Sequence, residues 1–282
     1  MFYWTIIVGI LAALLYRLAY PLHPVPSSEQ LIVESKKTIH EKESMAAAPI
    51  LKYLTVPAVA KHTATVIFVH GLGDTGNGWR PVADMFKVDP ALAHVKWMLP
   101  HSPVRPVTAN MGITMPSWFD IYSFGFDTTE DEQGMVKSAN MINELVKYEI
   151  EINGIDPSRI VLGGFSQGGA MSLLSGLTGD HKLAGIAVMS GWLPMKNKFK
   201  EMASKNAAST PVFWGTGSAD PLVKLQFAKM SSEFLVEQLG IPVAKDGELK
   251  GLDYNVYDGL GHETTPQELE DLKKFIKMAI PK

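Results

Sequence analysis

Residues 158–170 read SRIVLGGFSQGGA and place one serine between an apolar run and a group of small residues. The run over 158–165 predicts a buried strand, and the residues over 168–178 predict a helix. Ser166 stands at the centre of a Gly-x-Ser-x-Gly pattern, where glycines keep Cβ atoms out of a strained turn and leave the serine Oγ exposed. On this stretch alone, Ser166 could equally be an ordinary small residue of a crowded turn.

The rest of the chain alternates β-rich runs with helical stretches. Several runs are almost continuously apolar, as is typical of strands covered on both faces. This alternation predicts the α/β class, with a mostly parallel, doubly wound sheet and helices on both faces. The expected strands lie at 65–70, 94–100, 158–165, 184–191, 210–217 and 252–259, and the expected helices at 131–150, 168–178, 221–239 and 265–279.

Composition excludes several classes of function. The 282 residues include 26 basic and 29 acidic side chains, a formal net charge of −3, so there is no basic footprint for nucleic acid. The chain has no cysteine, which excludes a disulfide framework, a thiolate metal site and a cysteine nucleophile. No dinucleotide fingerprint or P-loop lysine occurs, and we expect neither a cofactor nor a metal.

The N-terminal segment differs from the rest of the chain. Residues 2–16 carry no charge, and the apolar character continues past Arg17, so we expect 1–22 to anchor the protein in a membrane. A cleaved signal peptide is the rival, although no basic residue precedes the run. Because Arg17 follows the run, the positive-inside rule places the main domain in the cytoplasm. Residues 23–49 are polar and predict a linker, which leaves 50–282 as the folded domain.

A nucleophilic serine needs a histidine base and an acid that orients it, here in the chain order Ser, Asp, His. Asp220 follows the expected strand 210–217, and His262 follows the expected strand 252–259. The carboxyl ends of parallel strands meet at one edge of the sheet, where ligands bind. We therefore expect Ser166, Asp220 and His262 to converge there as a catalytic triad.

Two alternatives for the acid remain open. Asp220 precedes a proline and could simply cap a helix. Asp253 or Asp258 could then orient the histidine in its place.

The tetrahedral oxyanion of acyl transfer needs backbone N–H donors. We expect one donor to be the backbone N–H of Gln167, directly after the serine. Gln167 would thus matter more for its backbone than for its side chain. The other is expected from Leu72, in the glycine-rich loop 70–76 that follows the strand 65–70. As an alternative, the glycine-rich loop could bind a phosphate group. We expect His70 to have a structural role in shaping this loop.

Together these motifs resemble the acyl-protein thioesterase and lysophospholipase family of α/β-hydrolases. The resemblance runs from about residue 50 to the C-terminus. The stretches that carry it are HGLGDTG at 70–76, GFSQGGA at 164–170, DPLV at 220–223, GH at 261–262 and SPVRPVTANMGITMPSWFDIY at 102–122.

The resemblance implies an activity and its substrates. The expected reaction is hydrolysis of palmitoyl thioesters on S-acylated proteins, with lysophospholipids or other carboxylesters as secondary substrates. Ser166, Asp220 and His262 fall on the family's triad positions, and Leu72 and Gln167 on its oxyanion positions. A soluble, cytoplasmic member would begin near Met45, so 1–44 is an added anchor and linker or an over-extended start. A remote alternative is an anchored binding protein without turnover.

The segment 103–126 is too apolar for a solvated loop. We predict that Met111, Ile113, Met115 and Trp118 line a groove for the acyl chain, because flexible and apolar side chains suit such a site. The alternative is that the segment packs on the core, which best fits Trp118.

Overall fold

The computed structural model describes residues 51–123, 129–245 and 247–282. The chain divides into Met1–Pro49 and Ile50–Lys282, and only the second unit is described below. The predicted anchor at 1–22 and linker at 23–49 lie outside the described residues. Across the described ranges, none of the helices is long and apolar enough to cross a membrane.

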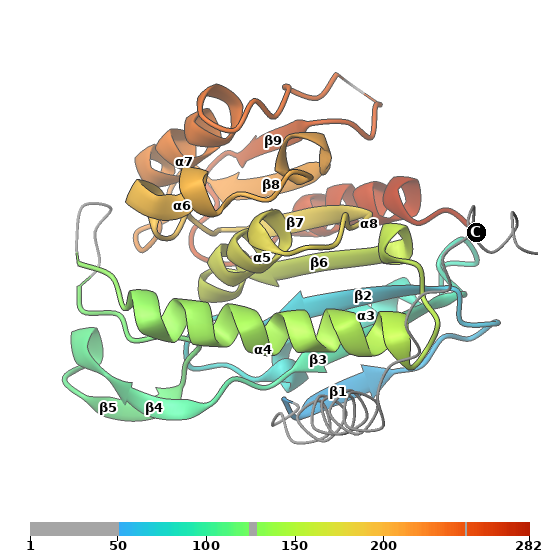
Figure 1. Cartoon of the computed structure of the whole chain (residues 1–282), viewed down its shortest axis with the longest axis horizontal. Coiled ribbons are helices and arrows are strands. Elements are labelled where there is room, and N and C mark those ends of the chain that lie inside the picture. The colour runs from blue at the N-terminus through green and yellow to red at the C-terminus, as the bar shows by residue number, and fades with distance from the viewer. Residues whose placement is uncertain (1–50, 124–128, 246) are drawn as a thin grey trace, which may run out of the picture. The chain divides into compact units, whose positions relative to one another are not determined.

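A seven-stranded sheet forms the centre of the domain, in the order β1-β3-β2-β6-β7-β8-β9 (Figure 1). All neighbouring strands are parallel except β1, which pairs antiparallel with β3. The strands are β1 (Tyr53–Val56), β2 (Ala64–Val69), β3 (Val95–Pro100), β6 (Ile160–Phe165), β7 (Gly185–Met189), β8 (Val212–Gly217) and β9 (Leu252–Tyr257). A separate antiparallel hairpin joins β4 (Val104–Val107) to β5 (Ile113–Pro116).

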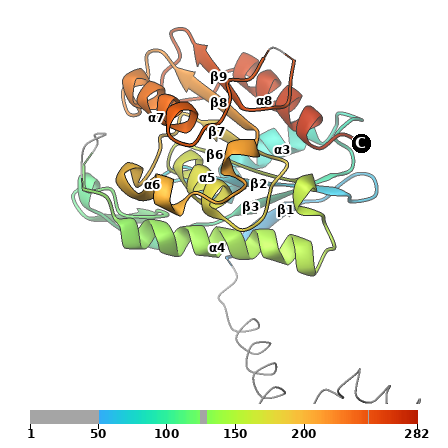
Figure 2. The same cartoon turned by 45° about the horizontal axis from the view of Figure 1, so that its top comes forward.

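Helices cover both faces of this sheet, as Figures 1 and 2 show. One face packs against α4 (Glu132–Glu151), α5 (Gln167–Thr178), α6 (Lys196–Met202) and α7 (Leu225–Glu237). The other packs against α3 (Arg80–Phe86) and α8 (Pro266–Ala279). Short 3₁₀ turns occur at Gly76–Trp79, Thr108–Asn110, Pro157–Arg159 and Ala207–Ser209.

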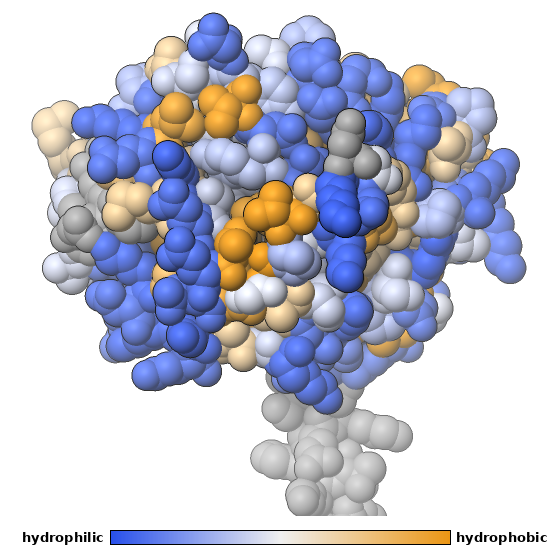
Figure 3. All heavy atoms as spheres, turned by 90° about the horizontal axis from the view of Figure 1, so that it is seen from above, coloured by the Kyte–Doolittle hydropathy of each residue, from blue (hydrophilic) through white to orange (hydrophobic). Residues whose placement is uncertain are grey.

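The core consists of two apolar layers, one on each side of the sheet. Every side chain of β2, β7 and β8 is buried, as expected for strands covered on both faces. The outer surface seen in Figure 3 is mainly hydrophilic, with apolar residues in small separate groups. The predicted doubly wound α/β architecture is confirmed.

All six predicted strands are present, and several short elements were not predicted because their patterns are too brief. Strand β1 and the β4–β5 hairpin use strands of four residues, and α3 and α6 have seven residues each. Helix α7 begins at Leu225 rather than 221, because Asp220 accepts the N–H groups of Leu222 and Val223 and holds that segment in a turn.

Candidate active site

Ser166 occupies a strained turn between β6 and α5. Its φ and ψ are 54° and −119°, a conformation that non-glycine residues rarely adopt and that clusters at functional sites. The flanking glycines make this turn sterically possible. A Cβ on Gly164 would lie 2.4 Å from the Gly168 carbonyl carbon, and a Cβ on Gly168 would lie 2.0 Å from the Val69 oxygen. The Gly-x-Ser-x-Gly spacing therefore reflects backbone contact between β2, β6 and α5.

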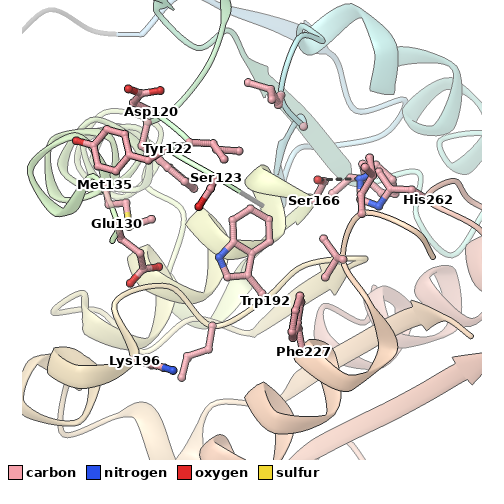
Figure 4. Close-up of a pocket in the computed structure, with 18 of the residues that line it drawn as sticks. Asp120, Tyr122, Ser123, Glu130, Met135, Ser166, Trp192, Lys196, Phe227 and His262 are labelled. Atoms are coloured by element: carbon pink, nitrogen blue, oxygen red, sulfur yellow. Dashed lines mark hydrogen bonds between the residues drawn. The ribbon is translucent and has the colours of Figure 1, made fainter. Parts of the chain in front are cut away.

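His262 links the serine to a carboxylate. Its Nε2 lies 2.9 Å from Ser166 Oγ, and its Nδ1 lies 2.7 Å from Asp220 Oδ2 (Figure 4). An ionised carboxylate only accepts hydrogen bonds, so Nδ1 carries the proton and Nε2 is left to accept from the serine O–H. The structure thus brings together the three residues predicted from the strand ends, in an order suited to nucleophilic catalysis.

Asp220 is held in place from two sides. Its Oδ1 accepts backbone N–H groups from Leu222 at 2.8 Å and Val223 at 2.9 Å, while Oδ2 faces His262. Burial raises the pKa of this carboxyl, but the hydrogen bonds from His262 and the two N–H groups outweigh it, so the net pKa lies below its ordinary value. Asp220 therefore orients the imidazole and also caps the local turn.

The alternative acids are engaged elsewhere. Asp253 Oδ1 accepts a hydrogen bond from Asn255 at 3.0 Å, and Asp258 Oδ1 accepts one from Ser218 at 3.0 Å. Among these aspartates, the structure places Asp220 against the histidine.

The two predicted oxyanion donors lie beside the serine. Gln167 is the first residue of α5, and the first N–H groups of a helix have no acceptor within the helix. Leu72 lines the same cavity as Ser166. A Cβ on its neighbour Gly71 would lie 3.4 Å from Ser166 Cβ, so this loop passes directly over the turn.

His70 shapes that loop, as the sequence predicted. Its Nδ1 lies 2.7 Å from the Gly71 oxygen, and its Nε2 accepts the Ser102 N–H at 3.1 Å. The ring is fully buried, and burial lowers the pKa of His70. A neutral imidazole with its proton on Nδ1 satisfies both contacts.

A cavity of about 280 Å³ opens beside Ser166 and His262. Most of its wall is apolar, contributed by the loop after β5, by α4, by the loop after β7 and by the start of α7. Figure 4 shows Trp192 and Phe227 between the catalytic side and the far side. Its apolar lining residues include Phe119, Ile121, Met135, Trp192, Leu193, Leu222, Val223 and Phe227.

The far side of the cavity from Ser166 is polar. Figure 4 places Asp120, Glu130 and Lys196 there. Glu130 Oε2 accepts the Met195 N–H at 2.8 Å, and burial raises the pKa of this carboxyl. This contact joins the segment before α4 to the segment before α6 across the cavity.

The structure corrects the prediction of the acyl groove, because none of the four predicted side chains lines the cavity. Met111 is 88% exposed in the left-handed conformation at the hairpin connection, and Ile113 is 51% exposed on β5. Met115 contacts the Asn110 amide. Trp118 is fully buried, so the alternative of core packing holds for it.

The cavity wall was missed because its members lie far apart in the chain and none carries a local motif. The hairpin leaves Met111 exposed and Met115 partly buried against Asn110, while Phe119 and Ile121, just beyond it, line the cavity. Among the described residues, no group of three or more His, Cys, Asp and Glu side chains could hold a metal ion.

Comparison with known proteins agrees with this geometry. A family model described as phospholipase/carboxylesterase matches residues 53–280. Acyl-protein thioesterase 1 of Cryptococcus neoformans is 45% identical over 236 residues, covering 82% of this chain and 98% of that protein. Acyl-protein thioesterase 1 of Gibberella zeae is 43% identical over 239 residues, covering 81% and 95%.

Solved structures share this fold. Arabidopsis thaliana SOBER1 superposes with a TM-score of 0.70 at 30% identity, covering 77% of this chain and 99% of that one. Zea mays acyl-protein thioesterase 2 gives a TM-score of 0.69 at 27% identity, covering 81% and 99%. The match to the family model, the similarity to the fungal relatives and the shared fold show that this chain belongs to the phospholipase/carboxylesterase family of α/β-hydrolases.

Proposed function

We propose that this chain is a serine hydrolase that removes fatty acyl groups, including palmitoyl, from S-acylated cysteines of proteins. The observation that carries the proposal is the hydrogen-bonded series Ser166, His262 and Asp220 beside an apolar cavity. The names of the fungal relatives, which are acyl-protein thioesterases, support an acylated protein as the substrate.

Acylation of the enzyme is the first step. Ser166 Oγ attacks the thioester carbonyl carbon while His262 Nε2 takes the serine proton. The N–H groups of Leu72 and Gln167 stabilise the oxyanion that forms. The C–S bond then breaks, the cysteine sulfur leaves with the proton from His262, and the fatty acid is esterified to Ser166.

Water completes the cycle in the second step. His262 takes a proton from a water molecule, which attacks the acyl-serine carbonyl. Collapse of this second tetrahedral intermediate returns the proton to Ser166 and releases the fatty acid. The reaction uses side chains, backbone donors and water, and it requires no cofactor.

The cavity supplies binding energy for the acyl chain. Each CH₂ group moved from water to an apolar wall contributes about 0.8 kcal/mol, so eight buried groups contribute roughly 6 kcal/mol. The aromatic side chains of Phe119, Trp192 and Phe227 provide such a wall next to the triad.

Hydrolysis of lysophospholipids or other carboxylesters is the second candidate. The family description, phospholipase/carboxylesterase, favours it. The same triad serves both reactions, but a cysteine thiol has a pKa near 8.5 and leaves with less help from a general acid than an alcohol. The triad therefore permits hydrolysis of both thioesters and carboxylesters. The difference between the two substrates lies in the leaving group, a thiol or an alcohol.

A comparison of two substrates tests the proposal. We expect a higher kcat/KM on a palmitoylated cysteine peptide than on lysophosphatidylcholine, and loss of both activities in Ser166→Ala. Ser158→Ala, at the opposite end of β6, is the matched control and keeps both. A preference for the lipid would replace the thioesterase by the second candidate, and activity retained in Ser166→Ala would refute the mechanism.

We also propose that the hydrolase domain works at the cytoplasmic face of a membrane, with 1–22 as its anchor. The support is the sequence alone, through the apolar run and the position of Arg17 after it.

A further inference from the structure

The side chain of Gln167 is fully buried next to the nucleophile and binds a loop on another part of the chain. Its Oε1 accepts the Trp118 backbone N–H at 2.9 Å. Its Nε2 donates to the Phe119 oxygen at 2.9 Å and to Ser117 Oγ at 3.1 Å. Three of the four hydrogen-bonding positions of the amide are therefore used within one three-residue segment.

The orientation of this amide is set by its partners. Ser117 Oγ donates its proton to the Phe119 oxygen at 2.6 Å, so it is left to accept from Gln167 Nε2. A flipped amide would set its NH₂ group against the Trp118 N–H and its oxygen against the Phe119 oxygen. Both strong bonds would then be lost, and buried donors and acceptors would be left unsatisfied, which is unfavourable away from water.

The segment that Gln167 holds is bonded in turn to the loop that carries Leu72. Trp118 Nε1 donates to the His70 oxygen at 2.9 Å, two residues before Leu72. The Gly73 N–H donates to the Pro116 oxygen at 2.8 Å, one residue after it. Leu72 is thus bracketed by two hydrogen bonds from residues 116–118.

We propose that Gln167 acts on both halves of the oxyanion hole, supplying one N–H from its backbone and positioning the Leu72 N–H through its side chain. The route runs from the amide to Trp118 and from its indole to the His70 carbonyl. Displacement of a donor by about 1 Å can reduce a rate by about 100-fold, so a loop held by a few bonds matters for catalysis. The side chain is a positioning group, and the inference rests on the proposed acyl-transfer reaction.

Gln167→Met tests this in the full-length chain, because methionine has a similar length, no amide, and leaves the backbone N–H in place. We expect kcat to fall by about 10- to 100-fold on both a butyryl and a palmitoyl thioester, with KM for the butyryl substrate changing less than about 3-fold. The rate at which a fluorophosphonate labels Ser166 should fall by a similar factor, since its phosphoryl oxygen enters the same hole.

A double-mutant cycle locates the route. Trp118→Phe removes the bond to the His70 oxygen, and we expect it to lower the labelling rate as well. If both side chains act through one route, the double variant loses little more than the worse single variant. Independent, multiplying losses would overturn the proposed route.

A stability control separates positioning from general damage. Ile142→Val removes one methylene from the core between α4 and the sheet, and it is expected to lower the melting temperature by about 2–4 °C while leaving kcat and labelling near wild type. All variants are assayed below their melting transitions. The inference fails if Gln167→Met keeps its kcat and labelling rate, or if its loss lies wholly in KM. If the wild-type protein hydrolyses neither thioester, the proposed function fails, but the labelling rates still test the role of Gln167.

Discussion

Replacing Asp220 by asparagine exchanges one oxygen for an NH₂ group at the centre of the site. The carbonyl oxygen of the asparagine would take the Oδ1 position, because the N–H groups of Leu222 and Val223 need an acceptor there. The NH₂ group would then face His262 Nδ1 at the place where Oδ2 now lies 2.7 Å away. As a donor, it selects the imidazole with its proton on Nε2.

That tautomer cannot act as the base. With a proton on Nε2, His262 has no lone pair for the Ser166 hydroxyl, which lies 2.9 Å away. Loss of the correct tautomer in a serine triad lowers kcat by about 10⁴-fold, which corresponds to roughly 5 kcal/mol in activation free energy. Stability should change far less at neutral pH, because both backbone hydrogen bonds to the side-chain oxygen remain.

The assay is steady-state hydrolysis of a palmitoyl thioester peptide, which gives kcat, with thermal unfolding measured in parallel. Asp258→Asn, an exposed aspartate bonded to Ser218, is the matched control and should keep wild-type kcat. A kcat for Asp220→Asn within about 10-fold of wild type would refute the tautomer argument, as would an equal loss in the control.

Two further predictions concern stability. Gly168→Ala should lower the melting temperature steeply and abolish activity, because the new Cβ would meet the Val69 oxygen at 2.0 Å. The control Gly261→Ala, which has open space around its Cβ, should melt like wild type. Equal melting temperatures for the two variants would contradict the steric argument. Burial raises the pKa of Glu268 from its ordinary value of 4.5 to about 8. Between these two pKa values the native state keeps a proton that the unfolded chain has released. The free energy of unfolding should therefore fall as the pH rises from about 5 to about 8. Glu268→Gln should flatten that slope in melting curves taken across this range, and an unchanged slope would show that Glu268 is ionised in the fold.

The triad could be predicted because each member follows a strand with a strong local pattern. Ser166 lies in a motif whose glycines are required because neighbouring backbone atoms leave no room for a Cβ on either side of the serine. Asp220 and His262 each follow a run that reads clearly as a strand, and parallel strands bring their carboxyl ends to one edge. Chain order and sheet geometry together were sufficient to predict that these residues meet.

The residues of the cavity wall could not be predicted, because the sequence pattern does not show which distant segments meet in the fold. Met135 lies on α4, Trp192 follows β7 and Phe227 lies on α7, and only the folded sheet brings them together. Met111 reads as apolar and flexible in the sequence, but the hairpin turns it outward. The role of the Gln167 side chain was likewise hidden, because its partners lie about 50 residues away.

The hydrogen bonds of the triad span long stretches of chain, 96 residues between Ser166 and His262 and 42 between His262 and Asp220. Contacts this distant in sequence tend to form late in folding, because closing a long loop costs entropy before the contact stabilises anything. Strand β9, which precedes His262, is also the edge strand that completes the sheet. A partly folded chain in which β9 has not yet joined the sheet would therefore carry the serine without its base. Hydrolysis should therefore begin only once β9 has joined the sheet, so recovery of activity during refolding would report completion of the whole sheet.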